Sequence, residues 1–536
     1  MSYKTKDLKM TFLGVTPILQ DKTGSLKPQD IVALSALMTF KGKTVKELYQ
    51  EAIDKGQNID EKVKKIIKKS SLRGHASIAT TPAICFSYEA SKFIDSMMTG
   101  AVFSSSLMAS GRRTNTTVED IVYPTSIDQN KAVKEKYKEI SEKNINFLNK
   151  LLENGVEKDE ASKIMQYGIY GTGIIAYPIE SIIAFKQEIE QEKDWMPEEG
   201  KMVVEKIEKY LKTMGLDLIY ISRELAARNV YPSPNIFKDP QKINIVRDLI
   251  QQKSLPKDLT KITDFSFTKS LNLEKEAGKI VKLQKEMIKD PKNLKKKWRE
   301  ILEMRHQFMR DWQNVLSLKI LSSVSWRVWS EKKRHRTVPM VPDSIYYSLE
   351  RCQQVFKKYN SKISQRKLSK KDLSMIDRFF TLPYPIRANK EFLYEYLERV
   401  AESIEIYFEF TKKYKIPAAD ALYMIPRGIR IDLFQEYNLF NLISGYFPLR
   451  TCSTAEAQLR QISRIEMIKI KQLLKKKGFN NISQLMATKC HIPGFCLEEK
   501  NCPIINSLLP KYDETWHEEM KKQLDDDFEE KLKNFK

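Results

Sequence analysis

The sequence has little of what interrupts helices or crosses membranes. Only 18 Gly and 21 Pro occur in 536 residues, which excludes collagen-like or low-complexity character and, together with abundant Lys, Glu, Ile and Leu, favours helices. The two longest uncharged runs, 96–111 and 164–179, hold 16 residues each, fewer than the roughly 20 that span a bilayer. The opening residues are charged, so we expect neither a secretion signal nor a membrane span.

Cysteine is scarce as well. Six cysteines in so long a chain do not make a disulfide framework, and without an export signal we expect a reducing, cytoplasmic location. Clustered cysteines would then indicate a metal site rather than disulfides.

Negative charge falls short of positive charge. There are 92 Lys and Arg against 69 Asp and Glu, a net charge of +23. The surplus has three interpretations: a nucleic-acid surface, solvated lysine-rich helix faces, or a concave site for anionic small molecules. Charge alone does not separate them.

A weak internal repeat runs at about half the chain length. Tyr123-Pro124 recurs as Tyr384-Pro385, and each pair precedes a long amphipathic pattern, at 130–154 and 389–414. Residues 155–161 then align with 415–421 at an offset of 260. The similarity lies in apolar pattern more than in identity, so this alignment alone does not establish a duplication.

A strand followed by a helix is expected in each half. Residues 82–89 have the short apolar pattern of a strand, with a helix expected through Phe93 and Met98. Residues 315–320 and a Trp-rich helix through Trp326 and Trp329 repeat this order.

Motif residues flank these elements. The first half has Gly74-His75-Ala76-Ser77, then Ser105 and Ser110-Gly111-Arg112; the second has Arg334-His335-Arg336, Asn438, Leu449-Arg450-Thr451-Cys452 and Ala457-Gln458-Leu459-Arg460. This order resembles the flavin-dependent thymidylate synthases, whose signature is R-H-R-x-x-S-x-N-E-x-S-x-R. Each half lacks what the other keeps, because Gly100-Ala101-Val102 stands at R-H-R in the first half and the S-x-R part is lost in the second.

The resemblance implies a fold and an assembly. We expect an α+β, helix-rich chain made of two tandem divergent copies of the flavin-dependent thymidylate synthase fold. The first repeat would span 1–237, a helical linker and the start of the second repeat 238–300, and the second repeat 301–536. Since the family assembles from four single repeats, this chain would form a homodimer, a pseudo-tetramer of repeats.

The resemblance also implies a composite site, with residues carried over by motif position. The substrate dUMP would be bound by Ser110, Gly111, Arg112, Glu331, Arg334 and Arg450, with Arg450 the catalytic residue that activates the uracil. FAD would be bound by Thr39, Ser77, Arg334, His335, Arg336 and Asn438, and His75 would lie near the folate. Three positions depart from the family pattern: Glu331 replaces a glutamine, Leu422 a dUMP-binding arginine, and Leu107-Met108 the N-E pair.

The implied reaction is reductive methylation of dUMP to dTMP with methylenetetrahydrofolate, FAD and NADPH. All of these ligands are anions, which favours the third interpretation of the charge. Two alternatives stay open: methylation of a related pyrimidine nucleotide, UMP or dCMP, and a catalytically decayed homologue that binds nucleotides or nucleic acid.

A late cysteine cluster suggests metal. Cys490, Cys496 and Cys502 are loosely spaced, which is weak evidence for zinc, but some family members have a similar cluster together with a cysteine at the position of Cys452. Four thiolates would suit a structural Zn²⁺ near Arg450; four buried or free thiols are the alternative.

Overall fold

The computed structural model describes residues 3–18, 26–109, 115–226, 230–252, 255, 259–270, 272–502, 505 and 512–535. The chain forms two compact units. Unit 1 comprises 1–244, 325–336 and 342–431, and unit 2 comprises 245–324, 337–341 and 432–536. Within the described residues, no helix is long and apolar enough to cross a membrane.

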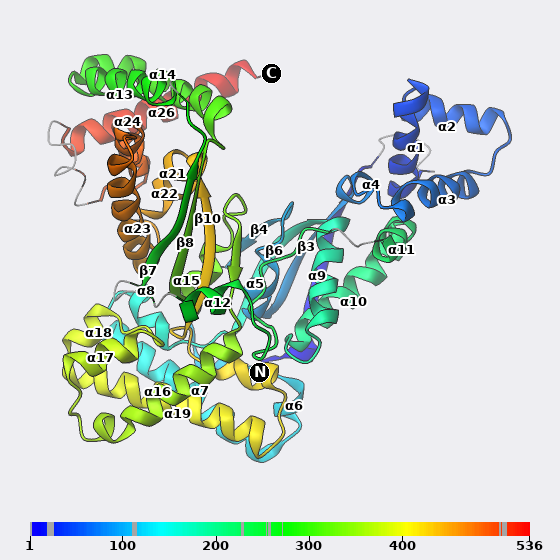
Figure 1. The fold of residues 1–536 in the computed structure, drawn as a ribbon. Coiled ribbons are helices and arrows are strands. Elements are labelled where there is room, and N and C mark those ends of the chain that lie inside the picture. Colours follow the sequence, from blue (N-terminus) through cyan, green and yellow to red (C-terminus); the bar gives the residue numbers. More distant parts are fainter. Residues whose placement is uncertain are drawn as a thin grey trace. The chain divides into compact units, whose positions relative to one another are not determined.

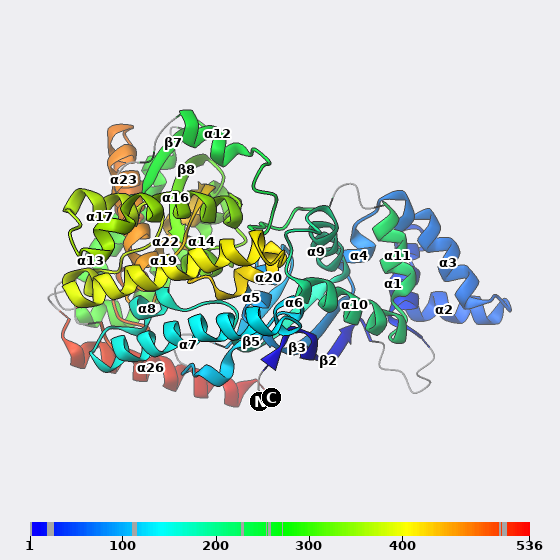
Figure 2. The ribbon, with the colours of Figure 1, turned by 90° about the horizontal axis from the view of Figure 1, so that it is seen from below.

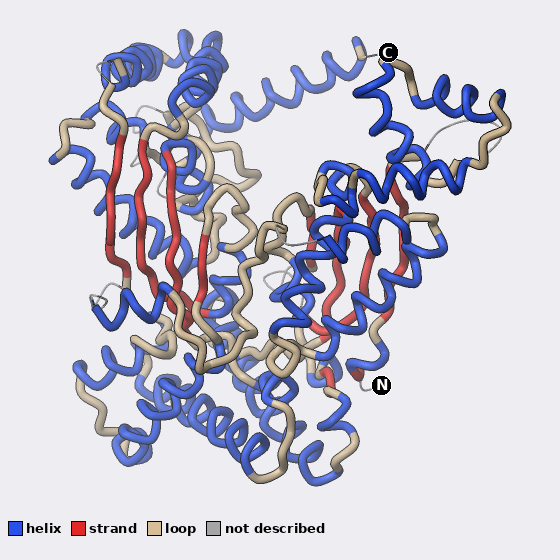
Figure 3. Tube along the Cα trace, turned by 45° about the vertical axis from the view of Figure 1, so that its right-hand side comes forward, coloured by secondary structure: helices blue, strands red, loops and turns tan. Residues whose placement is uncertain are grey.

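Unit 1 is built on a four-stranded antiparallel sheet in the order β2-β3-β6-β4 (Figures 1 and 3). The strands are β2 (Lys9–Thr16), β3 (Ala83–Ser91), β4 (Ser105–Met108) and β6 (Tyr170–Pro178). Along β3 buried residues alternate with less buried ones, as expected of a strand with one face in the core. The strand at 82–89 and the helix after it, α5 (Phe93–Met98), are confirmed.

The helices of unit 1 come from residues 1–244, 325–336 and 342–431. The amino-terminal ones are α1 (Pro28–Lys41), α2 (Val45–Asp54), α3 (Ile59–Lys69) and α4 (Ser77–Thr80). Then come the short strand β5 (Val122–Tyr123), which pairs with β1 (Tyr3–Lys4), and α6 (Thr125–Asp128), α7 (Lys131–Glu153), α8 (Lys158–Ala161), α9 (Ile179–Gln191), α10 (Glu198–Thr213) and α11 (Asp217–Ala226). Later segments add α15 (Trp326–Lys332), α16 (Ile345–Ser364), α17 (Lys370–Asp377), α18 (Tyr384–Ala388), α19 (Lys390–Lys412) and α20 (Ala418–Ala421).

Unit 2 has a second four-stranded sheet, in the order β7-β8-β10-β9. Its strands are β7 (Thr260–Phe267), β8 (Leu316–Ser325), β9 (Met340–Pro342) and β10 (Arg430–Asn438). Its helices are α12 (Ile245–Gln252), α13 (Leu273–Ile288), α14 (Pro291–Trp312), α21 (Leu439–Ile443), α22 (Tyr446–Arg450), α23 (Ala457–Lys476), α24 (Asn480–Leu485) and α26 (Glu514–Asn534).

The two sheets repeat one pattern. Strands β2, β3, β6 and β4 correspond in sheet order and chain order to β7, β8, β10 and β9, and each first strand carries a bulge, at Leu13 and at Thr263. Strand β6 maps onto β10, and α8 onto α20, at the expected offset of 260. The two tandem divergent copies of an α+β fold are therefore confirmed.

One local expectation is corrected. The segment 238–300 contains helices, but it also contains β7, which was not anticipated. Its residues Thr260–Phe267 include Thr, Ile and Phe, which favour strands, and β7 is completed only by hydrogen bonds to β8, far along the chain. The boundaries at 237 and 300 stay a prediction.

The long helices of the two repeats, α7 and α19, lie side by side in unit 1 (Figures 1 and 2). Three ion pairs join them: Lys136–Glu409, Lys143–Glu402 at 2.8 Å and Lys150–Glu395 at 2.8 Å. From one ion pair to the next the lysine number rises by seven and the glutamate number falls by seven, so the helices are antiparallel. The three lysines lie on one face of α7 and the three glutamates on one face of α19. In the buried seam, Asn144 donates to Ser403 Oγ at 3.1 Å.

These charges differ between the repeats in a regular way. The helices α7 and α19 have 23 residues each and match at an offset of 259. Lys136, Lys143 and Lys150 therefore occupy the positions of Glu395, Glu402 and Glu409. Like repeats would set like charges against each other, so the pattern favours pairing of unlike repeats.

We predict that the triple variant K136E/K143E/K150E lowers the free energy of unfolding by about 2–3 kcal/mol, roughly 1 kcal/mol for each part-exposed pair. Adding Glu395→Lys, Glu402→Lys and Glu409→Lys should restore most of that loss, because the opposite charges then face each other again. Denaturant titration of the three proteins checks this. Equal stability of the triple variant and its six-fold partner would contradict a pairing role.

Candidate functional site

A small cavity of about 80 Å³ in unit 1 is lined by residues from both repeats. We call it the cation cavity. It is lined by Lys92, Asp95, Met108, Ala109, Tyr167, Arg327, Ser330, Glu331, Arg334 and Arg427. Of the predicted dUMP-binding residues, Glu331 and Arg334 lie here, and Met108-Ala109 directly precede Ser110, Gly111 and Arg112, which lie outside the described residues.

The repeats meet through their backbones beside this cavity. Gln166 and Pro426 form an antiparallel bridge. On either side of it, Arg427 N donates to Met165 O at 2.8 Å and Gly168 N donates to Tyr423 O at 3.0 Å. This contact places the Arg427 guanidinium 4.6 Å from the centre of the Tyr167 ring, a cation–π arrangement.

Helix α15 supplies the other wall. Ser325 caps it by accepting from Val328 N, and Arg327, Ser330, Glu331 and Arg334 follow at spacings that place them on one face. The tryptophans between them, Trp326 and Trp329, are fully buried.

Two contacts fix the side chains of this helix face. Arg327 pairs with Glu331 at 2.7 Å, and the Tyr167 hydroxyl donates to Ser330 Oγ at 2.6 Å. The charge of Glu331 is thus balanced by Arg327, which fits a carboxylate beside an anion site.

Positive charge is concentrated and buried in the cation cavity. Lys92 is 5 % exposed and Arg427 is 3 % exposed. Burial, followed by the charge of Arg427, lowers the pKa of Lys92 to about 8, and burial lowers the pKa of Arg427 to about 10. The Arg334 Nε is buried without a hydrogen-bond partner among the described residues. Buried cations that lack full compensation form a strong binding site for an anion.

A larger cavity of about 540 Å³ lies among α1, α3 and α4 in unit 1. We call it the lysine cavity. It brings together the predicted Thr39, Ser77 and His75 with Lys62, Lys65 and Lys69, and no carboxylate lines it. Its apolar walls include Leu37, Phe40, Ile66 and Ile78, so an aromatic ligand with anionic groups suits it.

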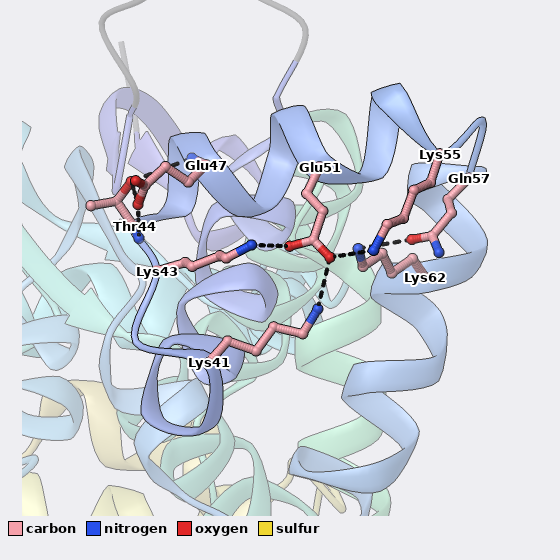
Figure 4. Close-up of polar contacts among 8 residues, drawn as sticks. All are labelled: Lys41, Lys43, Thr44, Glu47, Glu51, Lys55, Gln57 and Lys62. Carbon is pink, nitrogen blue, oxygen red and sulfur yellow. Dashed lines mark hydrogen bonds and ion pairs between the residues drawn. The ribbon is translucent and has the colours of Figure 1, made fainter.

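Further lysines gather beside this cavity, around Glu51 of α2 (Figure 4). Lys41, Lys43 and Lys55 lie 3.3, 3.0 and 2.7 Å from the Glu51 carboxylate, and their hydrogen bonds hold its pKa at about 2. One carboxylate thus balances only part of the charge of three lysines. Lys62, which lines the lysine cavity, donates to Gln57 at 2.9 Å.

The rest of the R-H-R motif is placed differently. Arg336 donates to the carbonyl oxygens of Ala101 at 2.9 Å and Thr99 at 3.1 Å, and to Ser104 Oγ at 3.2 Å. These three hydrogen bonds join Arg336 of the second repeat to residues of the first repeat. His335 follows α15 directly, in the same segment of unit 1.

Two predicted residues belong to unit 2. Asn438 ends β10 and caps α21 by accepting from Asn441 N at 3.1 Å, while its amide donates to Asn314 at 3.0 Å. Arg450 is the last residue of α22. Their roles in binding flavin and uracil stay predictions.

The late cysteines gather in unit 2 without forming a metal site. Burial, followed by Cys452, Cys496 and Cys502, raises the pKa of the Cys490 thiol to about 12, so the four thiols lie near one another. Among the described residues, however, no three Cys, His, Asp or Glu side chains are arranged to hold a metal ion. The geometry therefore gives the zinc prediction no support, and the function proposed below uses no metal.

Comparison with known proteins identifies the family. The sequence model of the family "Thymidylate synthase complementing protein" matches residues 21–176 and 259–474. The chain belongs to this family. Its two matched regions fall one in each repeat.

Individual relatives of the family are distant. A flavin-dependent thymidylate synthase of Pyrococcus abyssi (strain GE5 / Orsay) is 24 % identical over 130 residues, 24 % of this chain and 51 % of the relative. The chain thus spans about half the length of this curated relative.

The structural similarity of this chain to solved structures is low. A UMP/dUMP methylase, PolB, from Streptomyces cacaoi bound with 5-Br dUMP has a TM-score of 0.33 at 12 % identity, covering 43 % of this chain and 100 % of its own. The flavin-dependent thymidylate synthase ThyX from Helicobacter pylori, complexed with FAD and dUMP, has a TM-score of 0.28 at 13 % identity, with the same coverages. The family assignment rests on the family model alone.

Sequence reasoning missed several residues of the cation cavity. Lys92, Asp95, Arg327 and Arg427 were not among the expected site residues. The spacing of Arg327, Glu331 and Arg334 on one helix face was a usable signal, whereas Lys92 and Arg427 become neighbours only through the contact between the repeats.

We predict that Lys92→Met raises the free energy of unfolding near pH 7 by about 2–3 kcal/mol, because burial costs the charged lysine stability. Between pH 8 and 10.5 the unfolded chain keeps the Lys92 proton and the folded chain has released it, so wild-type stability rises with pH there. The advantage of the variant should shrink over that window. Denaturant titrations at pH 7, 9 and 10 check this, and a variant less stable than wild type at pH 7 would contradict it.

Proposed function

We propose that this protein methylates a pyrimidine nucleoside monophosphate, converting dUMP to dTMP with methylenetetrahydrofolate as carbon donor, FAD and NADPH. The observation that carries the proposal is the cation cavity. It joins Arg334 of the R-H-R motif to Met108-Ala109, the residues directly before the S-x-R motif, within one chain.

Each half of the site has a chemical task. Arg334 binds the nucleotide phosphate through charge-assisted hydrogen bonds, and Ser110, Gly111 and Arg112 complete that binding from the first repeat. Glu331, neutralised by Arg327, orients the arginine side chains of α15. Arg450 is the catalytic residue that the family resemblance implies, because a fixed guanidinium beside a uracil stabilises the N3 anion and makes C5 nucleophilic.

The lysine cavity suits the remaining ligands. We propose that Thr39 and Ser77 hold FAD there, with His75 near the folate; the family resemblance adds Arg334, His335, Arg336 and Asn438 as flavin contacts. The flavin, when bound, supplies hydride transfer. Lys62, Lys65 and Lys69 attract its phosphates and the carboxylates of folate, while the apolar walls exclude water.

The choice of nucleotide is the finer part of the proposal. Glu331 and Leu422 depart from the family pattern at two dUMP-binding positions. UMP and dCMP are therefore the alternative substrates. A decayed homologue that only binds nucleotide or nucleic acid is the alternative of another class, and a homodimer is the assembly we propose.

We predict that the purified protein releases tritium from 5-labelled dUMP when FAD, NADPH and methylenetetrahydrofolate are supplied. Arg450→Ala should lower that release at least 100-fold, as removal of one charge-stabilising donor does in other enzymes. Parallel reactions with UMP and dCMP measure the preference for dUMP. Full release by the Arg450→Ala variant contradicts the catalytic assignment, and no release by wild type with any of the three nucleotides favours the decayed homologue.

A second prediction concerns the flavin. Lys65→Ala should weaken FAD binding about 10-fold, because it removes one cation from the lysine cavity. Lys68→Ala is the matched control, since Lys68 is exposed on the same helix and does not line the cavity. Equilibrium dialysis followed at the flavin absorbance measures both; equal affinities in the two variants would remove FAD from this cavity.

A further inference from the structure

We propose that each chain has one phosphomonoester site, in which Lys92 and Arg427 bind the phosphate dianion, and that the repeat-related counterpart of this site is closed. The proposal rests on the proposed function for the identity of the nucleotide. Lys92 and Arg427 lie outside the signature by which the family is recognised.

Charge balance within the cation cavity is the first support. Arg327 and Glu331 neutralise each other at 2.7 Å. Among the described lining residues, Lys92, Arg334 and Arg427 then face one further carboxylate, that of Asp95, which accepts from the Tyr88 hydroxyl. The surplus is two positive charges, which matches a phosphomonoester of about −2 at neutral pH.

The donors of these cations are positioned and available. No described residue accepts a hydrogen bond from the Lys92 ammonium, which is 95 % buried, and its side chain runs across Gly171, where a Cβ would lie 2.8 Å from Lys92 Cγ. Arg427 is fixed by donating from Nε and Nη2 to Gln166 O at 3.0 and 2.8 Å. Together with the unpartnered Nε of Arg334, these groups form a built site.

The size of the cavity selects the ligand group. The cavity volume of about 80 Å³ has room for a phosphate group. Arg427 also stands five residues after Leu422, the position at which the family has a dUMP-binding arginine. Arg427 thus supplies a cation near the position where this chain has Leu422 in place of the family's arginine.

The counterpart of the site follows from the repeat. Lys92 N donates to Ile169 O and Trp326 N donates to Ile429 O, at 2.9 and 2.8 Å. Because Ile169 and Ile429 are repeat equivalents, Trp326 is the equivalent of Lys92. By the same alignment Tyr167 corresponds to Arg427, Phe93 to Arg327 and Gly100 to Arg334. Each cation of the site has an apolar, aromatic or glycine counterpart.

Aromatic rings fill the space around the counterpart residues Phe93 and Trp326. Phe93 stacks on Tyr423 with ring centroids 4.0 Å apart and lies 5.4 Å from Trp326 and 5.8 Å from Phe237. All four rings are fully buried. A Cβ on Gly100 would lie 3.1 Å from Pro234, so the segment around Pro234 occupies the space next to Gly100. Among the described residues beside Gly100 there is one cation, Lys333, and its ammonium already donates to Ser96 O.

Calorimetric titration of the full chain with dUMP, with deoxyuridine as competitor, tests the proposal. We expect one dUMP per chain. Lys92→Met and Arg427→Met should each lower the preference for dUMP over deoxyuridine by 10- to 100-fold, the range for hydrogen bonds to a charged group. Arg427→Lys should keep part of the preference, and Arg387→Met, at an exposed arginine, should keep all of it.

The outcomes separate the two proposals. Two dUMP per chain, or an unchanged preference in both Met variants, overturns this inference and leaves the proposed reaction standing. One dUMP per chain with the expected loss of preference, but no methylation of any nucleotide, supports the site and overturns the reaction. No binding of dUMP at all overturns both. A ratio of affinities is the readout because misfolding lowers both affinities alike.

Discussion

Two short backbone segments, around Gln166 and Pro426, exchange hydrogen bonds where the repeats meet in unit 1. This contact brings Tyr167 and Arg427 face to face, and it sets the β3–α5 junction of the first repeat beside α15 of the second. The cations of the resulting cavity come from both repeats. The site therefore depends on the pairing of the repeats, and the ion pairs between α7 and α19 hold that pairing in register.

Fusion of two copies removes a symmetry constraint. In a symmetric dimer of single repeats, residue i faces j and j faces i on identical chains, so the position shared by Lys143 and Glu402 would face itself. One chain can place lysine on one copy and glutamate on the other. The same freedom separates the cavity from its counterpart, where Arg427 and Lys92 stand opposite Tyr167 and Trp326 in the alignment. The cations therefore lie in the cation cavity, and aromatic rings pack together at its repeat-related counterpart.

Sequence patterns predicted the elements whose signals are local. The strand at β3, the amphipathic helices α7 and α19, and the tandem order of the copies are all found. Of the predicted site residues, Arg334 and Glu331 share one cavity and Thr39, His75 and Ser77 share another, and their roles stay predictions. The element that was missed, β7, depends on a distant partner, because it is completed by β8. Lys92 and Arg427 are more than 330 residues apart in sequence, so no local pattern links them.

The most direct test of the account is complementation between two inactive chains. Lys92→Glu inactivates the first-repeat side of the cavity and Arg334→Glu the second-repeat side, and the two variants can be co-expressed with different tags and purified as mixed assemblies. If one chain builds the whole site, the mixed assembly should be as inactive in tritium release from dUMP as either variant alone. Recovery of about a quarter or more of the wild-type rate would show that the site forms between chains, and would contradict the account.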